Sequence, residues 1–361
     1  MSEPPTGADR LTQEAMGHWY VRLLANGVSY FDASEVIPRV GSWGDWCRLW
    51  IERAALRERE AEEMARAGRR LSAAEGYARA ALAYHFAQFV YHEDPALKRE
   101  AQEKKVACYL KALPDLRPPG ERVAIPYEAA TLPGILRIPG GPGEKGKPPC
   151  VVLISGLDST KEEFHTLEAV LHARGLATLA FDGPAQGERA DLSLRPDYEH
   201  VVTAVVDFLA GDRRVDPGRI GALGVSLGGY YCPRALAAEK RLRAGVASGG
   251  FYDMAGFWHT LPALAKQGLR HAFQAATEAE TGERVKALSL RGRLAGLDRP
   301  LLVIGGEMDR LCPAEESRLM AQEAGRMAEL VIYPEGGHVC NNIPFLWRPL
   351  AADWLAGKLG A

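Results

Sequence analysis

The pattern of apolar and polar positions along the chain changes character near residue 118. Residues 9–112 show helical patterns only, and the stretch 43–69 is rich in Ala, Glu, Arg and Leu, which favour helices. Asp94 followed by Pro95 is typical of a helix N-cap and its first helical position. We therefore expect a helical N-terminal cap domain over residues 1–118, ended by the proline-rich segment 114–120.

Beyond that segment, short apolar runs alternate with helical stretches. This alternation predicts a mostly parallel sheet with helices on both faces, in a catalytic domain of residues 119–361. One segment, about 250–297, holds no convincing strand, and we expect a helical insertion there. The predicted strands are 122–127, 134–138, 150–154, 177–181, 220–225, 244–248, 301–304 and 330–333.

A serine lies in a glycine-rich motif after one of these strands. Gly224-Val-Ser226-Leu-Gly228 matches G-x-S-x-G, with an apolar run before it and a helical stretch after it. A strand, a sharp turn at the nucleophile and then a helix is the context that this motif requires. The alternative is a Gly/Ser-rich turn without a catalytic role. The context favours Ser226 as a nucleophile.

An acid and a histidine follow in the order that such a serine needs. A serine hydroxyl is a weak nucleophile without a base. Asp309 lies just past the apolar run 301–304, and His338 follows two glycines just past the run 330–333. Glu307 is the rival acid, and we prefer Asp309 because it lies further beyond the strand. The order Ser, Asp, His is that of the α/β-hydrolase fold.

An oxyanion hole is expected from two backbone N–H groups. One belongs to Leu227, which follows the serine, and the other to Leu157 in the loop after the strand 150–154, with Asp158 as the second choice. Asp182, after another strand, could be catalytic, but a structural role in a turn-rich loop is the favoured interpretation.

Composition narrows the class of protein. The formal net charge of -2 gives no positive electrostatic field that would argue for binding to nucleic acid or to an anionic membrane. We see no secretory signal and no apolar run long enough to cross a bilayer. The six cysteines form no CxxC pair, and no nucleotide-binding glycine pattern occurs. We expect a cytoplasmic enzyme with a small-molecule substrate, no metal and no cofactor.

Aromatic residues cluster in the helical domain. They could line a substrate pocket, but core packing is the more common reason for aromatics at helical spacing. A homodimer built partly on these helices is a further expectation. The residues are Trp43, Trp46, Trp50, Tyr84 and His85.

Four segments together resemble the branch of α/β-hydrolases that contains 2,6-dihydropseudooxynicotine hydrolase and the polyketide-shortening hydrolases. The segments are 156–163 (GLDSTKEE), 181–188 (FDGPAQGE), 224–229 (GVSLGG) and 336–338 (GGH).

The resemblance implies a helical domain before the catalytic domain, triad roles for Ser226, Asp309 and His338, and cleavage of carbon–carbon bonds in diketone-like substrates. It also implies an acidic residue in the substrate pocket. Within 249–258 the only acid is Asp253, which with Asp158, Phe251 and Trp258 is our candidate for substrate binding.

We therefore expect a serine hydrolase that cleaves a carbon–carbon bond next to a ketone in a diketone-like or aryl ketone substrate. The sequence leaves open whether Ser226 attacks directly or His338 activates a water. A carboxylesterase or thioesterase with the same triad is the main alternative, and a non-catalytic regulatory protein on this fold is a second.

Overall fold

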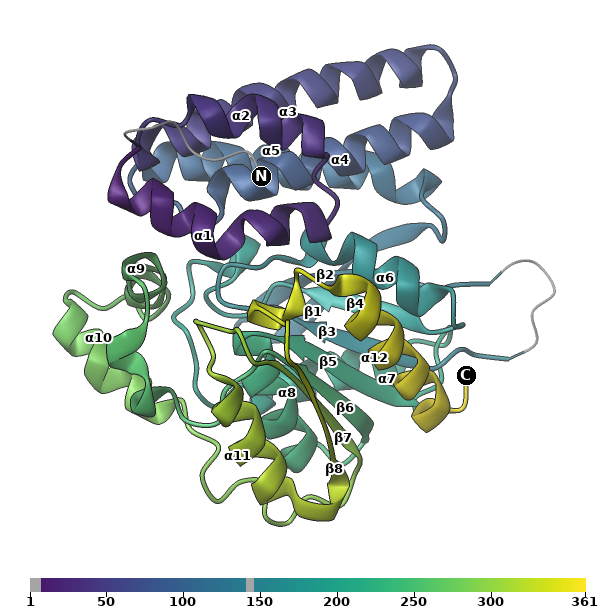
Figure 1. Cartoon of the computed structure of the whole chain (residues 1–361). Helices are drawn as coiled ribbons and strands as arrows, with labels where there is room; N and C mark the ends of the chain where they lie inside the picture. The colour runs from purple at the N-terminus through teal and green to yellow at the C-terminus, as the bar shows by residue number, and fades with distance from the viewer. Residues whose placement is uncertain (1–7, 141–145) are drawn as a thin grey trace. The chain divides into compact units, whose positions relative to one another are not determined.

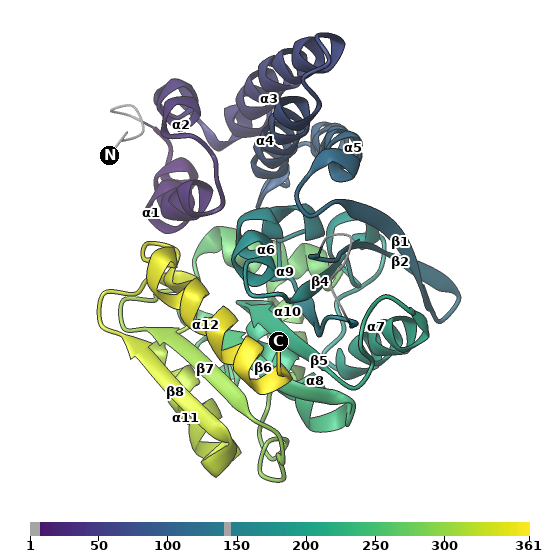
Figure 2. The same ribbon diagram turned by 90° about the vertical axis from the view of Figure 1, so that its right-hand side faces the viewer.

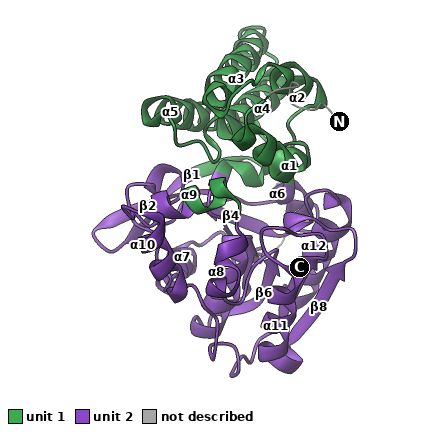
Figure 3. Cartoon of the chain, turned by 60° about the vertical axis from the view of Figure 1, so that its left-hand side comes forward, with its two compact units in different colours: residues 1–121, 162–166, 262–268 green, residues 122–161, 167–261, 269–361 purple. Residues whose placement is uncertain are grey.

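The computed structural model describes residues 8–140 and 146–361, which form two compact units (Figure 3). Unit 1 contains the described chain up to Glu121, together with Glu162–Thr166 and Pro262–Gly268. The domain boundary expected after residue 118 lies close to the end of this first stretch at Glu121. The sequence pattern does not indicate that the two later segments belong to the same unit as the helices. Unit 2 comprises Arg122–Lys161, Leu167–Leu261 and Leu269–Ala361.

One sequence expectation falls partly outside the described residues. Residues 1–7 belong to the N-terminal stretch in which we expect no secretory signal, and the structure does not describe them.

The N-terminal part of unit 1 is built from helices, as expected (Figure 1). Asp94 caps the last of these helices by accepting hydrogen bonds from the N–H groups of Ala96 (2.9 Å) and Leu97 (3.0 Å), with Pro95 in the first helical position. The predicted N-cap is therefore confirmed. The helices are α1 (Arg10–Ala25), α2 (Tyr30–Val36), α3 (Trp43–Arg66), α4 (Arg70–Gln88) and α5 (Pro95–Ala112).

The clustered aromatics form the core of these helices. Trp43, Trp46, Trp50, Tyr84 and His85 each expose 1% or less of their surface. The rings of Trp43 and Trp46 stack with centroids 5.0 Å apart, and the Trp46 indole N–H donates to the Phe86 carbonyl. Their burial agrees with core packing.

A buried carboxylate ties the segment Glu162–Thr166 to the helices of unit 1. Glu163 accepts hydrogen bonds from Arg22 (2.6 and 2.7 Å) and from the Asn26 amide (2.6 Å), and His85 Nε2 lies 3.2 Å from it. Burial raises the pKa of Glu163, but the charge of Arg22 and the contact with His85 outweigh it and hold the pKa well below its ordinary value. This carboxylate is therefore ionised and paired.

Unit 2 is built around an eight-stranded sheet in the order β1-β2-β4-β3-β5-β6-β7-β8. β2 runs antiparallel to β4, and the strands from β4 to β8 are parallel. The predicted mostly parallel sheet is confirmed. The strands are β1 (Gly120–Tyr127), β2 (Ala130–Arg137), β3 (Cys150–Ile154), β4 (Ala177–Phe181), β5 (Ile220–Val225), β6 (Leu242–Ser248), β7 (Leu301–Gly306) and β8 (Ala328–Tyr333).

Helices cover both faces of this sheet (Figure 2). On β5, Gly221 packs against Leu359 of α12, whereas Gly224 packs against Cys232 of α8. Because these positions are three residues apart on a strand, they face opposite sides. No helix among the described residues combines the length and apolarity needed to cross a bilayer. The remaining helices are α6 (His165–His172), α7 (Glu199–Gly211), α8 (Leu227–Ala238), α9 (Ala263–Ala272), α10 (Glu278–Arg284), α11 (Ala314–Ala324) and α12 (Pro344–Leu359).

The expectation of a helical insertion at about 250–297 is only partly met. α9 and α10 lie there, but the rest consists of loops and short 3₁₀ turns, and Asp253 forms an isolated antiparallel bridge with Ser289. Glycines and prolines between the helical patterns explain the interruptions.

Candidate active site

The turn at Ser226 joins β5 directly to α8. Ser226 has φ 56° and ψ −119°, a strained conformation for a residue with a side chain, and its N–H donates to the Ser248 carbonyl of β6 at 2.9 Å. The turn is sharp because Gly228 approaches the Ile154 carbonyl so closely that a Cβ there would overlap it. The Ser226 side chain is thereby placed at the carboxyl edge of the sheet, where parallel-sheet proteins bind ligands.

Three side chains that are far apart in the sequence meet at this edge. His338 Nε2 lies 2.9 Å from Ser226 Oγ, and His338 Nδ1 lies 2.9 Å from Asp309 Oδ2. A carboxylate only accepts hydrogen bonds, so Nδ1 carries the proton and Nε2 is left to accept the Ser226 hydroxyl proton. The set has the geometry of an activated serine.

The Asp309 carboxylate is held on both oxygens. Its side chain is 1% exposed, and Oδ1 accepts hydrogen bonds from the N–H groups of Leu311 (2.8 Å) and Cys312 (2.9 Å), while Oδ2 faces His338. The rival acid, Glu307, instead pairs with Arg318 at 2.6 Å on the exposed surface. The geometry therefore agrees with the preference for Asp309.

The loop that carries His338 follows β8 and is braced from inside. Val339 and Cys340 have positive φ values of 55° and 51°. Asn342 accepts a hydrogen bond from Gly337 N–H (2.8 Å) and donates to the Glu335 carbonyl (2.7 Å). Sequence reasoning missed Asn342, since nothing in the pattern marks a side chain that bonds back into its own loop.

Two cysteines adjoin the triad without competing with Ser226. Burial raises the pKa of the Cys340 thiol to about 12 and that of Cys312 well above its ordinary value. Because the thiolate is the reactive form, both are inert at neutral pH. Ser226 is the better nucleophile of this group.

Both candidate oxyanion donors adjoin the serine turn. Leu227 begins α8, and Leu157 follows Gly156, where a Cβ atom would be 3.2 Å from the Cβ of Ser226. Within the described part of the chain, neither the Leu157 N–H nor the Leu227 N–H donates to a protein acceptor. Both are therefore available to an oxyanion bound at Ser226.

The candidate substrate-binding residues fall into two groups. Asp158 shares the half-buried turn with Leu157, and Phe251 stacks on Tyr230 of α8 with ring centroids 4.9 Å apart. Asp253, in contrast, is paired with exposed Arg291 at 2.6 Å, and Trp258 lines an open hollow on α10. Asp158 and Phe251 therefore lie next to the serine turn, whereas Asp253 pairs with an arginine outside the triad.

Glu316 holds the loop that carries Phe251. Its carboxylate accepts hydrogen bonds from the N–H groups of Tyr252 (3.0 Å) and Asp253 (2.8 Å). Burial raises the pKa of Glu316 above its ordinary value. Sequence reasoning did not single out this residue, because the contact spans more than sixty positions of the chain.

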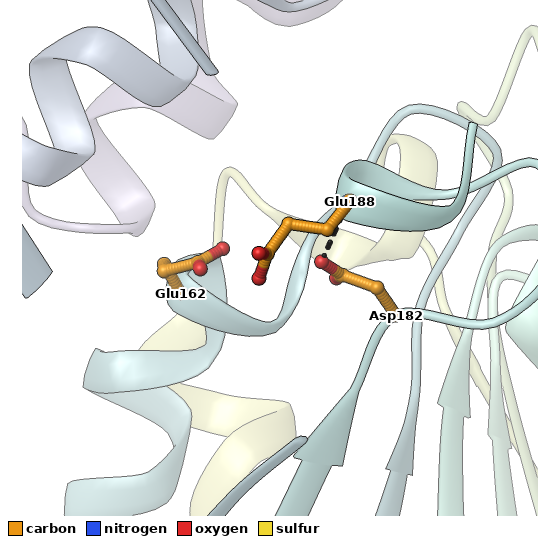
Figure 4. Close-up of side chains that lie close together, drawn as sticks. All are labelled: Glu162, Asp182 and Glu188. Carbon is orange, nitrogen blue, oxygen red and sulfur yellow. Dashed lines mark hydrogen bonds between the residues drawn. The ribbon is translucent and has the colours of Figure 1, made fainter. Parts of the chain in front are cut away.

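Asp182 has a structural role in unit 2. It accepts hydrogen bonds from the Lys161 ammonium (2.7 Å) and the Glu188 N–H (3.0 Å), the latter drawn in Figure 4. Lys161 also contacts the Glu188 carboxylate at 2.6 Å, and Arg122 pairs with the same carboxylate at 2.7 Å, so two cations of the chain balance the two carboxylates. Glu162, also drawn there, belongs to unit 1, where Lys105 lies 3.2 Å from it.

The Prolyl oligopeptidase family matches residues 197–360, the part that contains Ser226, Asp309 and His338. The chain is 34% identical over 353 residues to 2,6-dihydropseudooxynicotine hydrolase of Paenarthrobacter nicotinovorans, covering 97% of this chain and 94% of that one. It is 36% identical to Hydrolase acrC of Aspergillus aculeatus, over 65% of this chain and 61% of that one.

A crystal structure of the 2,6-dihydroxy-pseudo-oxynicotine hydrolase superposes with a TM-score of 0.86 at 34% identity, over 94% of this chain and 95% of that chain. Sequence and structure thus agree over nearly the whole length. The chain belongs to the α/β-hydrolase family that includes 2,6-dihydropseudooxynicotine hydrolase, and it is itself a hydrolase.

Proposed function

We propose that this hydrolase cleaves a carbon–carbon bond next to a ketone, in a diketone-like or aryl ketone substrate. The observation that carries the proposal is the hydrogen-bonded series from Ser226 through His338 to Asp309, with both distances 2.9 Å. The family resemblance supports the choice of bond, because its branch acts on carbon–carbon bonds.

In the first half of the reaction, Ser226 Oγ bonds to the ketone carbon while its proton passes to His338 Nε2. The resulting oxyanion accepts hydrogen bonds from the N–H groups of Leu157 and Leu227. As the C=O bond re-forms, now as the ester of Ser226, the carbon–carbon bond breaks and its electron pair leaves on the neighbouring carbon. His338 returns the proton to this carbon.

The leaving carbon needs stabilisation that an ester oxygen does not. A second carbonyl group or an aromatic ring spreads its charge as an enolate-like species, which is why the proposal specifies such substrates. In the second half, water attacks the acyl group on Ser226, His338 takes the water proton and then protonates Ser226. The products are a carboxylic acid and a ketone or arene.

These steps use only side chains and backbone groups of the chain, so the proposal includes no cofactor. The partner is a small-molecule substrate. We place the enzyme in the cytoplasm, since its six cysteines are unpaired and buried, as is usual in a reducing compartment. The homodimer stays a prediction from the sequence.

Asp253 is left out of the proposed substrate contacts, since Arg291 already neutralises it. Phe251 and Asp158 are retained, as neighbours of the serine turn.

A mass-resolved product analysis tests the proposal. Purified protein is incubated with β-diketones, aryl ketones including 2,6-dihydroxy-pseudo-oxynicotine, and simple esters, beside Ser226→Ala. We expect a ketone substrate to split into an acid and its partner, and the variant to lose about 10³-fold or more in rate. Turnover of esters alone would make the enzyme an esterase, and ketone cleavage that survives in the variant would favour attack by a His338-activated water.

A further inference from the structure

The segment Ser155–Lys161, which carries Leu157, is held at both ends by one neighbouring loop. At its start, the Gln186 amide Nε2 donates to the Ser155 and Gly156 carbonyls, each at 2.9 Å. At its end, the Lys161 N–H donates to Asp182 at 2.9 Å. The loop Asp182–Glu188 thus brackets the segment that supplies one oxyanion donor.

The bond to the Gly156 carbonyl has a geometric consequence for Leu157. The Gly156 C=O and the Leu157 N–H belong to the same peptide group, which is planar and trans, so they point in opposite directions. Because Gln186 fixes the direction of the C=O, it also fixes the direction of the N–H. One amide side chain therefore aims the donor without touching the substrate.

Gln186 is itself fully constrained. It is 2% exposed, and its Oε1 accepts hydrogen bonds from the Tyr198 hydroxyl (2.9 Å) and the Gly183 N–H (3.2 Å). The Gly183 N–H can only donate, so the oxygen of the amide must face it and the NH₂ group must face the two carbonyls. Tyr198 stacks on Tyr231 with centroids 3.8 Å apart, which immobilises its hydroxyl.

We propose that Gln186 is a positioning residue that orients the Leu157 N–H toward the oxyanion, through its hydrogen bond to the Gly156 carbonyl. The inference rests on the proposed function, because it takes Leu157 as an oxyanion donor. The hydrogen bonds of the Gln186 side chain within the described residues go to Ser155, Gly156, Gly183 and Tyr198, so on this account it acts without bonding to the triad or the substrate. It acts on the transition state alone, where the charge develops.

Two variants remove the NH₂ group of Gln186, and with it the hydrogen bonds to the Ser155 and Gly156 carbonyls, in different ways. Gln186→Glu keeps the acceptor for Tyr198 and Gly183 but turns a carboxylate oxygen toward the two carbonyls, whereas Gln186→Met keeps the length without polar groups. The matched control is Gln274→Glu, which removes a similar amide-to-carbonyl bond (to Asp191, 2.9 Å) at an exposed position. Melting curves establish the folded fraction of each variant.

The readouts separate orientation of the donor from general damage. We expect kcat to fall about 10- to 100-fold in both Gln186 variants, with KM changed by less than about 3-fold. An aryl trifluoromethyl ketone, which forms an oxyanion adduct with a reactive serine, should bind more weakly by a similar factor. The pH profile of kcat should not move, and Gln274→Glu should match the wild type.

If the turnover of the wild type depends on Ser226 and kcat is nevertheless unchanged in the Gln186 variants, this inference is wrong and the proposed function stands. A wild type without turnover or without dependence on Ser226 would overturn the proposed function and this inference with it. If the activity of both variants falls only in proportion to their folded fraction, the role of Gln186 is purely structural. This result would also overturn the inference.

Discussion

Gly156 packs directly against the nucleophile: a Cβ on residue 156 would lie 3.2 Å from the Cβ of Ser226 and 3.2 Å from the Val225 carbonyl oxygen. Contacts this short force a neighbour to move by a few tenths of an ångström. The two loops that carry the serine and one candidate oxyanion donor are therefore in contact through a position where only glycine fits without adjustment.

Replacing that glycine should separate the donor from the serine. For Gly156→Ala we expect kcat to fall about 10-fold, because small misplacements at the reacting centre are costly. Overpacking should lower the free energy of unfolding by about 1–3 kcal/mol. Steady-state kinetics and urea denaturation measure the two effects, and Gly256→Ala, in open space, is the control. Wild-type kcat in Gly156→Ala would contradict the close packing.

Asp309→Asn should disable the histidine rather than the fold. The asparagine oxygen can keep the hydrogen bonds from Leu311 and Cys312. Its NH₂ group would then donate to His338 Nδ1 and place the ring proton on Nε2, which can no longer accept from Ser226. We expect kcat to fall about 10³- to 10⁴-fold with a near-normal melting temperature. The matched variant of the rival acid, Glu307→Gln, should keep full activity. Full activity in Asp309→Asn together with loss of activity in Glu307→Gln would instead assign the acid role to Glu307.

Lys161 should be a large single contributor to stability. Its ammonium is buried against Asp182, with side-chain exposures of 1% and 0%. Lys161→Met would leave a buried carboxylate unpaired, and we expect a loss of about 3–5 kcal/mol in the free energy of unfolding. The exposed pair Lys286–Glu283 provides the control, because Lys286→Met should cost less than about 1 kcal/mol. Equal urea midpoints for the two variants would refute the assignment.

Glu188 should contribute to the loss of stability in acid. Burial raises its pKa, but the charge of Lys161 and a hydrogen bond from Arg122 outweigh this, so its pKa in the folded chain lies below the ordinary 4.5. The stabilisation is complete above the unfolded pKa and disappears as pH falls through the folded one.

Between about pH 5 and about pH 3, Glu188→Gln should therefore lose less stability than the wild type. Thermal or urea unfolding across this range measures the difference. Glu283→Gln, on the exposed surface, is the control and should follow the wild type. Parallel curves for Glu188→Gln and the wild type would show that the Lys161 contact has no such effect.

The sequence pattern predicted the sheet and the triad because both depend on local rules. Each strand is a short apolar run, and Ser226, Asp309 and His338 each follow such a run in an order that the fold dictates. The preference for Asp309 over Glu307 needed only the distance from the end of the strand. These features could be found without knowing which strands are neighbours.

The supporting residues could not be found in this way. Gln186 meets Ser155 and Gly156 only because β4 lies beside β3 in the sheet. The partner of Asp253, Arg291, lies 38 positions away in the irregular part of the insertion. Such contacts follow from the tertiary arrangement, and neither the composition nor the periodicity of a segment indicates them.

The most direct test of the central claim is the site of covalent labelling by a fluorophosphonate. Intact-mass and peptide mass spectrometry should find one adduct, on Ser226, absent in Ser226→Ala and formed far more slowly in His338→Ala. Label on another residue, or a folded wild-type protein that does not react, would contradict the assignment of Ser226 as a nucleophile activated by His338 and Asp309.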